Sequence, residues 1–247
     1  METHEHTLEA TTNDGDMVVV VTEPTASPEG GGDWPTVLWL IDAPGLRPAV
    51  RDAMGRLAGN GYRVVTPDLH HRLGRLLFKE PKDMSKPGAK EEMYSWIAAM
   101  TDDQIQHDGA VALNAAGVAS ADPYAAIGFC LGTRAVFRAI ERNPERVRAG
   151  ACFHPSFMVD DTADSPHLSA GDLSRPMYLG IGEADSVQPL ARHQAFLDAV
   201  APLDNVEVVT FPGAEHGFTW PGYPNYDETA AETSWAKTLD LFSKALA

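Results

Sequence analysis

Short apolar runs alternate with helix-like segments along most of this chain of 247 residues. Several of these runs are followed by Gly, Pro or Asp, and some are almost entirely apolar, which is typical of strands buried on both faces. This alternation predicts a single α/β domain over residues 1–247, with a mostly parallel, doubly wound sheet and helices on both of its faces. The predicted strands span residues 17–21, 36–41, 62–66, 124–129, 149–153, 177–181 and 206–211.

The segments between these runs predict the helices. Helices are expected over residues 48–57, 131–142, 188–200 and 227–246, and two more are expected after residue 90. The second of these begins at Thr101, because Gln104 lies three residues later and completes a capping box. Residues 68–90 are irregular and predict a long loop, with His70 and His71 on its surface.

Composition excludes several classes of partner. The chain has 35 acidic and 19 basic residues and a net charge of −16, which disfavours nucleic acids and anionic membranes. It has no apolar run as long as a membrane span and no signal-peptide pattern. Residues 1–14 are expected to be flexible, with His4 and His6 disordered. We expect a soluble cytoplasmic protein, either a monomer or a homodimer.

The two cysteines, Cys130 and Cys152, are too few for a disulfide framework. Cys152 lies in an apolar run and is expected to pack in the core. Cys130 stands in Gly-Phe-Cys-Leu-Gly, at residues 128–132, between a predicted strand and a predicted helix. A nucleophile in such a turn needs glycines on either side, and the following helix lowers the pKa of its thiol. The alternative is that Cys130 is a small buried core residue.

Two further residues follow predicted strands and complete a possible catalytic set. Asp185 comes after the run 177–181, and His216 comes after the run 206–211. The order nucleophile, acid, base is that of a Ser-His-Asp-type triad on an α/β sheet, whose strand ends meet at one edge. Asp185 could instead be a turn or helix-capping residue, Glu183 is a rival acid, and His216 could be a surface histidine.

These motifs resemble the dienelactone hydrolase family. The resemblance is carried by residues 128–132, by Gly-x-x-Asp at 182–185, by His-Gly-Phe at 216–218 and by the strand at 61–68, and it spans about residues 17–246. It implies an α/β-hydrolase fold and a Cys-His-Asp triad that cleaves esters or lactones. It implies no organic cofactor and no metal.

The resemblance also assigns roles to residues near the predicted strand 36–41. Asp42 stands where the family has a glutamate that helps to control the ionisation of the cysteine, and a turn residue before Pro44 is the equal alternative. The backbone N–H of Ala43 is the implied partner of the N–H of Leu131 in an oxyanion hole.

One departure from the family concerns the substrate. Trp220 stands where the type member has an arginine that holds a substrate carboxylate, and only Arg72 and Arg75 lie in the region of a second arginine. With Tyr223 and Tyr226 nearby, this favours a neutral, more apolar ester. The residues predicted to contact the substrate are His154, Phe129, Phe218 and Trp220.

We therefore expect an ester or lactone hydrolase that forms a thioester on Cys130 and takes a small-molecule substrate. Acyl transfer or another reaction at the same site is one alternative. A non-catalytic binding protein on a hydrolase fold is the other.

Overall fold

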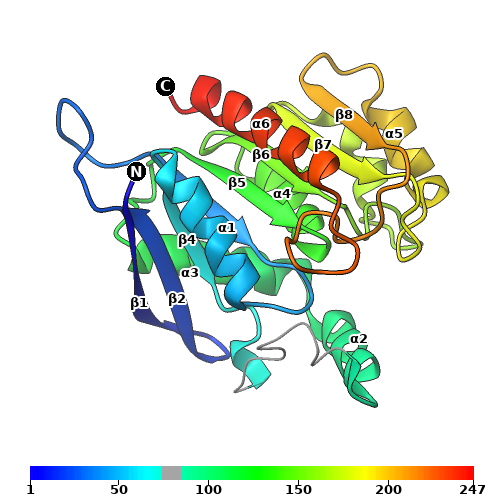
Figure 1. Ribbon diagram of the computed structural model, residues 1–247, viewed down its shortest axis with the longest axis horizontal. Helices are drawn as coiled ribbons and strands as arrows, with labels where there is room; N and C mark the ends of the chain where they lie inside the picture. Colours follow the sequence, from blue (N-terminus) through cyan, green and yellow to red (C-terminus); the bar gives the residue numbers. More distant parts are fainter. Residues whose placement is uncertain (74–84) are drawn as a thin grey trace. The chain divides into compact units, whose positions relative to one another are not determined.

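The computed structural model describes residues 1–73 and 85–247, and the chain forms two compact units, Met1–Tyr124 and Ala125–Ala247 (Figure 1). Both units have strands and helices in alternation, as the sequence predicts. That residues 1–247 act as one domain stays a prediction.

The first unit contains four strands of the sheet. Its strands lie in the order β1 (Thr3–Thr12), β2 (Gly15–Pro24), β4 (Arg63–Pro67) and β3 (Thr36–Leu40). β3 and β4 are parallel, whereas β2 is antiparallel to both β4 and β1. Every residue of β3 is buried, because helices α1 (Pro48–Gly59) and α3 (Asp102–Ala115) cover opposite faces of this sheet (Figure 1). Helix α2 (Ala89–Ala99) precedes α3, and the capping box of Thr101 and Gln104 is present.

The prediction that residues 1–14 are flexible is wrong. Thr3–Thr12 form β1, which pairs with Gly15–Pro24 over its whole length. His4 and His6 are therefore ordered. The sequence signal is weak because most side chains of this edge strand are polar, so the chain shows no apolar run there.

His70 and His71 were expected on the surface, but His70 is buried, with 2% of its surface exposed, and His71 is half-buried, with a side chain that is only 2% exposed. The reason is Asp108 on α3, which the sequence does not link to this segment. Arg72 donates two hydrogen bonds to the Asp108 carboxylate, at 2.7 and 3.0 Å, and His71 Nε2 lies 3.4 Å from Asp108 Oδ2. Arg75 lies outside the described residues.

The second unit holds strands β5 (Tyr124–Phe129), β6 (Val147–Phe153), β7 (Met177–Gly182) and β8 (Val206–Phe211), in that order. β6, β7 and β8 are parallel. Helices α4 (Leu131–Arg142) and α6 (Glu228–Ala245) lie on opposite faces of these strands (Figure 1). The helix predicted over 188–200 is instead a 3₁₀ turn, η5 (Leu190–His193), followed by α5 (Gln194–Val200).

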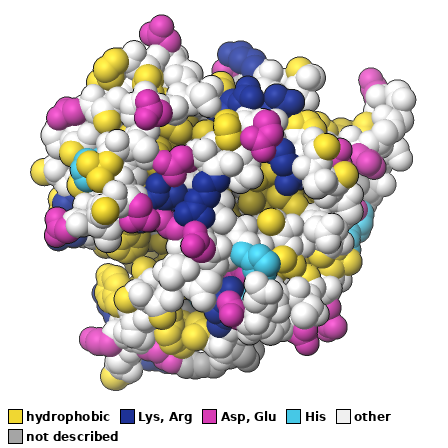
Figure 2. Space-filling model, turned by 180° about the vertical axis from the view of Figure 1, so that it is seen from behind, with side chains coloured by type: hydrophobic (Ala, Val, Ile, Leu, Met, Phe, Trp, Pro, Cys, Tyr) yellow, Lys and Arg dark blue, Asp and Glu magenta, His cyan; other side chains and the backbone are white. Residues whose placement is uncertain are grey.

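Acidic side chains are spread over the face that Figure 2 shows, and several of them lie beside Lys and Arg side chains. No helix within residues 1–73 and 85–247 has the length and apolar character that a membrane span requires.

Asp108 provides a test of the first unit. We expect Asp108→Asn to destabilise the protein by about 2 kcal/mol, because it leaves Arg72 and His71 without their shared carboxylate and Arg72 is partly exposed. Asp240→Asn is the matched control, since it removes only the exposed ion pair with Lys244 and should cost less than about 0.5 kcal/mol. Urea unfolding of both variants measures the difference, and equal midpoints would contradict the assignment.

Candidate active site

Cys130 occupies a strained turn between β5 and α4. Its φ of 53° and ψ of −115° lie in a region that residues with a side chain rarely adopt. A Cβ on Gly128 would lie 2.3 Å from the carbonyl oxygen of Gly132, so only glycine fits there. The backbone N–H of Cys130 donates to the carbonyl of Phe153 at the end of β6, which anchors the turn to the sheet.

The thiol of Cys130 has a hydroxyl beside it. Its Sγ lies 3.3 Å from Ser156 Oγ, and Ser156 is buried. The backbone N–H of Ser156 donates to the carbonyl of Cys130 at 3.1 Å, which fixes the hydroxyl next to the sulfur. Sequence reasoning missed Ser156, although its position two residues after His154, just beyond β6, was a usable signal.

The structure brings Asp185 and His216 together. His216 Nδ1 donates to Asp185 Oδ2 over 2.7 Å, and Asp185 is 3% exposed. The other carboxylate oxygen, Oδ1, accepts from the backbone N–H groups of Val187 and Gln188, at 2.9 and 2.6 Å. Asp185 is thus both the partner of His216 and the turn residue of the alternative interpretation. The hydrogen bonds from Val187 and Gln188 that form the turn also hold the carboxylate in place.

The loops that carry this pair are locked to each other. A Cβ on Gly182, at the end of β7, would lie 2.3 Å from the carbonyl oxygen of Ala214. Glu215 Oε2 accepts from the backbone N–H groups of Ser186 and His216, at 2.9 and 3.3 Å. The carboxylate of Glu183 instead accepts from the Thr210 hydroxyl, so the acid that binds His216 is Asp185.

His216 carries a strongly raised pKa. Burial of its ring lowers the pKa, but the negative charge of Cys130 and hydrogen bonds with Asp185 and Cys130 outweigh burial and raise it to about 10. Its side chain is 13% exposed. A cationic imidazole between a carboxylate and a thiolate is the arrangement that makes a cysteine nucleophilic at neutral pH.

At two other groups of this unit, burial decides the direction of the pKa shift. It lowers the pKa of His193, on η5, although the charge of Asp185 partly opposes this. It also raises the pKa of the Cys152 thiol well above its usual value, because Cys152 is fully buried in β6. Cys152 is therefore the packing residue that the sequence predicts.

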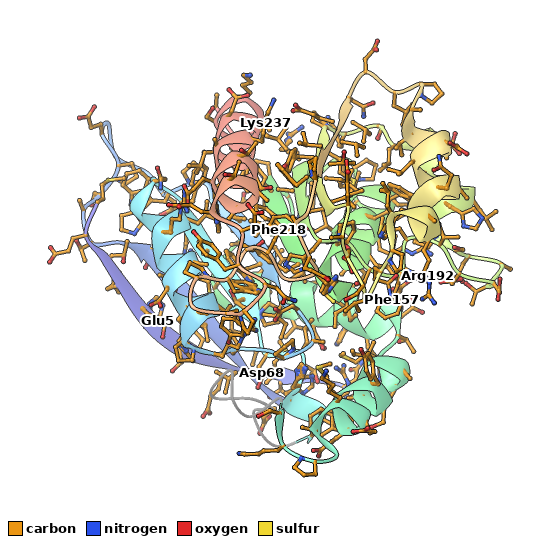
Figure 3. The ribbon with its side chains drawn as sticks, turned by 45° about the vertical axis from the view of Figure 1, so that its right-hand side comes forward. Glu5, Asp68, Phe157, Arg192, Phe218 and Lys237 are labelled. Atoms are coloured by element: carbon orange, nitrogen blue, oxygen red, sulfur yellow. The ribbon has the colours of Figure 1, made fainter. Side chains whose placement is uncertain are left out.

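His154 follows β6 and has a φ of 40°. Its ring centroid lies 4.9 Å from that of His216 and 5.5 Å from that of Phe218, both edge to face. Phe129 and Phe218 are fully buried, and Trp220 is 3% exposed with its ring 4.9 Å from Phe129. Phe218, which Figure 3 labels, belongs to the segment between β8 and α6. These aromatic rings pack around His154, and contact of Phe129, Phe218 and Trp220 with a substrate stays a prediction.

Leu131 is the first residue of α4, where backbone N–H groups have no partner within the helix and attract negative charge. Its N–H is suited to an oxyanion. Ala43, the other predicted donor, lies in the first unit, just after β3, and its role stays a prediction.

Asp42 also lies in the first unit. Arg47 donates to both of its carboxylate oxygens, at 2.5 and 2.7 Å, and the two residues are 3% and 4% exposed. The backbone carbonyl of Asp42 accepts from the N–H of Gly45, so Asp42 is the turn residue that the alternative interpretation expects. Its action on the cysteine stays a prediction. Sequence reasoning missed Arg47, five residues away.

The interaction of Cys130 with His216 gives a spectroscopic prediction. Because the charge of Cys130 raises the pKa of His216, Cys130→Ala should lower that pKa clearly from about 10. With the cysteine present, the ring loses its proton only as the pH rises toward 10. Titration of the histidine ring protons by NMR measures this. Cys152→Ala is the control and should change nothing, and an unchanged His216 titration in Cys130→Ala would disprove the interaction.

Comparison with known proteins identifies the family of the chain. The model of the dienelactone hydrolase family matches residues 19–246. The chain is 29% identical, over 226 residues, to a protein of Methylorubrum extorquens named "Putative carboxymethylenebutenolidase", and the match covers 88% of this chain and 74% of that protein.

Two crystal structures have the same fold. One is a "Putative Dienelactone Hydrolase" from Klebsiella pneumoniae, with a TM-score of 0.80 and 21% identity over 99% of this chain and 100% of that one. The other, from metagenomic libraries, is a "Dienelactone Hydrolase-like Promiscuous Phospotriesterase", with a TM-score of 0.76 and 21% identity over the whole of both chains. The chain is therefore an α/β protein and a hydrolase that belongs to the dienelactone hydrolase family.

Proposed function

We propose that the protein cleaves an ester or lactone with Cys130 as nucleophile, His216 as general acid and base, and Asp185 as the residue that orients the histidine. The observation that carries this proposal is His216, which donates to Asp185 and has its pKa raised to about 10 by the charge of Cys130. A histidine placed in this way can hold a thiolate and return its proton to a leaving group.

In the first half of the reaction, the Cys130 thiolate attacks the carbonyl carbon and forms a C–S bond. The carbonyl oxygen becomes an oxyanion, to which the N–H of Leu131 donates, with that of Ala43 as the predicted second donor. The C–O bond of the ester then breaks. The departing alkoxide takes the proton of the His216 imidazolium and leaves as an alcohol, or stays attached to the acyl chain when the substrate is a lactone.

In the second half, the now neutral His216 takes a proton from water. The resulting hydroxide attacks the thioester carbonyl, and the C–S bond breaks to release a carboxylic acid and the Cys130 thiolate. The 2.7 Å bond to Asp185 keeps Nδ1 protonated throughout, so that Nε2 is the nitrogen that gains and loses the proton.

The surroundings of the site favour a substrate that is neutral rather than carboxylated. Trp220 is buried against Phe129, where the type member of the family has an arginine. The arginines of α4 are engaged, since Arg134 donates to Asp160 and Arg138 donates to Glu141. With a net charge of −16, the protein does not attract an anionic substrate.

The rings of His154 and Phe218 support this choice. Both rings are buried, and His154 packs edge to face against Phe218 and His216, so they make the packing beside His216 largely apolar, which disfavours a charged group there. The two cysteines are both free thiols, which favours a cytoplasmic location, where thiols stay reduced.

The proposal is tested with a panel of neutral and carboxylated lactones and small activated esters. Wild type should hydrolyse neutral substrates with the higher kcat/KM, and Cys130→Ala should lose at least about a thousandfold of that activity, as the loss of a nucleophile does. Cys152→Ala is the matched control and should keep it. Full activity in Cys130→Ala would sink the proposal, and a preference for carboxylated lactones would sink its substrate part.

A burst of thioester should precede turnover if acyl transfer to water limits the rate. With an added amine or alcohol in place of water, product analysis separates hydrolysis from acyl transfer. An unreactive Cys130 in iodoacetamide labelling would instead indicate a binding protein.

Ser156 gives a further prediction. Ser156→Ala removes the hydroxyl beside the sulfur and keeps the backbone N–H that holds the loop. Because hydrogen bonds to charged groups contribute about 1.5–3 kcal/mol, we expect alkylation of Cys130 to need a higher pH and kcat/KM to fall about tenfold or more. The control is Ser243→Ala, because the Ser243 hydroxyl donates to the carbonyl of Asp240 on the surface. An alkylation profile that matches wild type would show that the hydroxyl does not stabilise the thiolate.

A further inference from the structure

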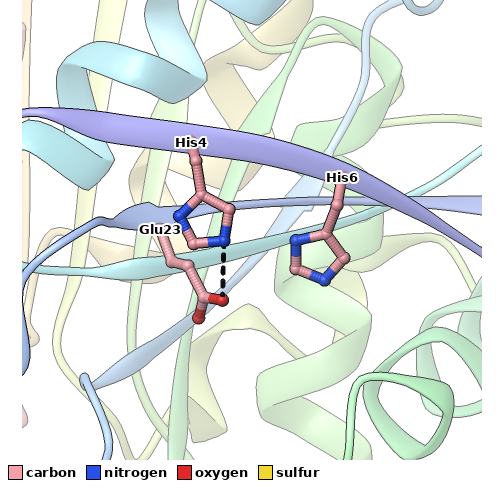
Figure 4. Close-up of side chains that lie close together, drawn as sticks. All are labelled: His4, His6 and Glu23. Carbon is pink, nitrogen blue, oxygen red and sulfur yellow. Dashed lines mark ion pairs between the residues drawn. The ribbon is translucent and has the colours of Figure 1, made fainter.

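Three side chains that could bind a metal lie together on the β1–β2 hairpin of the first unit. His4 and His6 are two residues apart on β1, so both side chains point to the same face of the sheet. Glu23 on β2 is the direct cross-strand partner of His4. Figure 4 shows the two imidazoles side by side, with the Glu23 carboxylate below the His4 ring and joined to it by the dashed line of their ion pair.

The geometry is close to that of a binding site. One ligand atom from each residue lies within 4.8 Å of the others, and His4 Nε2 is 3.5 Å from Glu23 Oε1. The imidazole rings are stacked, with centroids 5.5 Å apart and planes at 16°. Ligands around one zinc ion sit roughly 2.0–2.2 Å from it, so small side-chain rotations would bring all three to a common ion.

The site is open and partly organised. The His4 side chain is 48% exposed and that of Glu23 is 22% exposed, so an ion can reach both. Arg63 Nε lies 3.1 Å from Glu23 Oε2, the oxygen that faces away from His4. Arg63 therefore orients the carboxylate so that Oε1 is presented to the histidines, while its positive charge reduces the affinity for a cation.

The simplest alternative is that His4 and Glu23 form only a surface ion pair, which would contribute little. That alternative accounts for neither the stacking of His6 on His4 nor the approach of all three ligand atoms.

We propose that His4, His6 and Glu23 bind one divalent transition-metal ion, with Zn²⁺ as the probe of that class. Two imidazole nitrogens and one carboxylate oxygen suit Zn²⁺, Ni²⁺ and Cu²⁺ and do not suit Ca²⁺ or Mg²⁺, which prefer oxygen ligands. Water fills the remaining position. The ion ties β1 to β2 across their pairing. The triad of the proposed function lies in the second unit, so this site does not depend on it.

The test is a calorimetric titration of the full chain with Zn²⁺. A Cys130→Ala background is used, because a thiolate with a histidine beside it also binds zinc. We expect one ion per chain with micromolar affinity. His4→Gln, His6→Gln and Glu23→Gln should each weaken binding at least about tenfold, whereas His167→Gln, which removes a histidine of the second unit, should leave it unchanged.

A second measurement keeps the test independent of folding. In the Cys130→Ala protein with His4, His6 and Glu23 intact, Zn²⁺ should shift the NMR signals of the His4 and His6 rings together and raise the melting temperature. A tenfold excess of Mg²⁺ should do neither. Absence of binding at millimolar Zn²⁺, or equal affinity in all three variants and the control, would overturn the proposal.

Discussion

The hydrogen bond from His216 to Asp185 is the interaction on which the arrangement of the candidate site in the second unit depends. Both partners stand on loops that follow strands, and loops are the least constrained parts of most folds. Here they are fixed, because Asp185 is itself held by the N–H groups of Val187 and Gln188, and Glu215 binds the N–H of His216. The close approach of Gly182 to Ala214 brings the two loops together. The two loops are therefore positioned by hydrogen bonds to backbone N–H groups and by the glycine at position 182, where a side chain would not fit.

Burial lowers the pKa of both His193 and His216, but their net shifts are opposite because their neighbours differ. Burial is the main cause that lowers the pKa of His193, so this ring tends to stay neutral and packs as a core residue. His216 is also largely buried, but it contacts two negative groups, and these outweigh the loss of water. A charged histidine in a nearly dry setting persists only where charged partners stabilise it.

Much of this site could be predicted because its signals are local. The glycines around Cys130 and the positions of Asp185 and His216 after apolar runs are readable from neighbouring residues alone. The errors concern contacts between distant residues. Asp108 binds the Arg72 segment from another helix, so the burial of His71 could not be inferred from its polar neighbours. Likewise β1 is stabilised by its backbone pairing with β2 rather than by a run of apolar residues of its own.

The role that family resemblance gives to Asp42 meets a competing partner. Both of its carboxylate oxygens accept from Arg47, and both residues are almost fully buried, so breaking the pair would leave an uncompensated charge at a cost of roughly 3–5 kcal/mol. A role of Asp42 at the cysteine stays a prediction. Because Asp42 is held by Arg47 on both oxygens, and its carbonyl accepts from the N–H of Gly45, the pair fixes the turn that leads from β3 to Pro48.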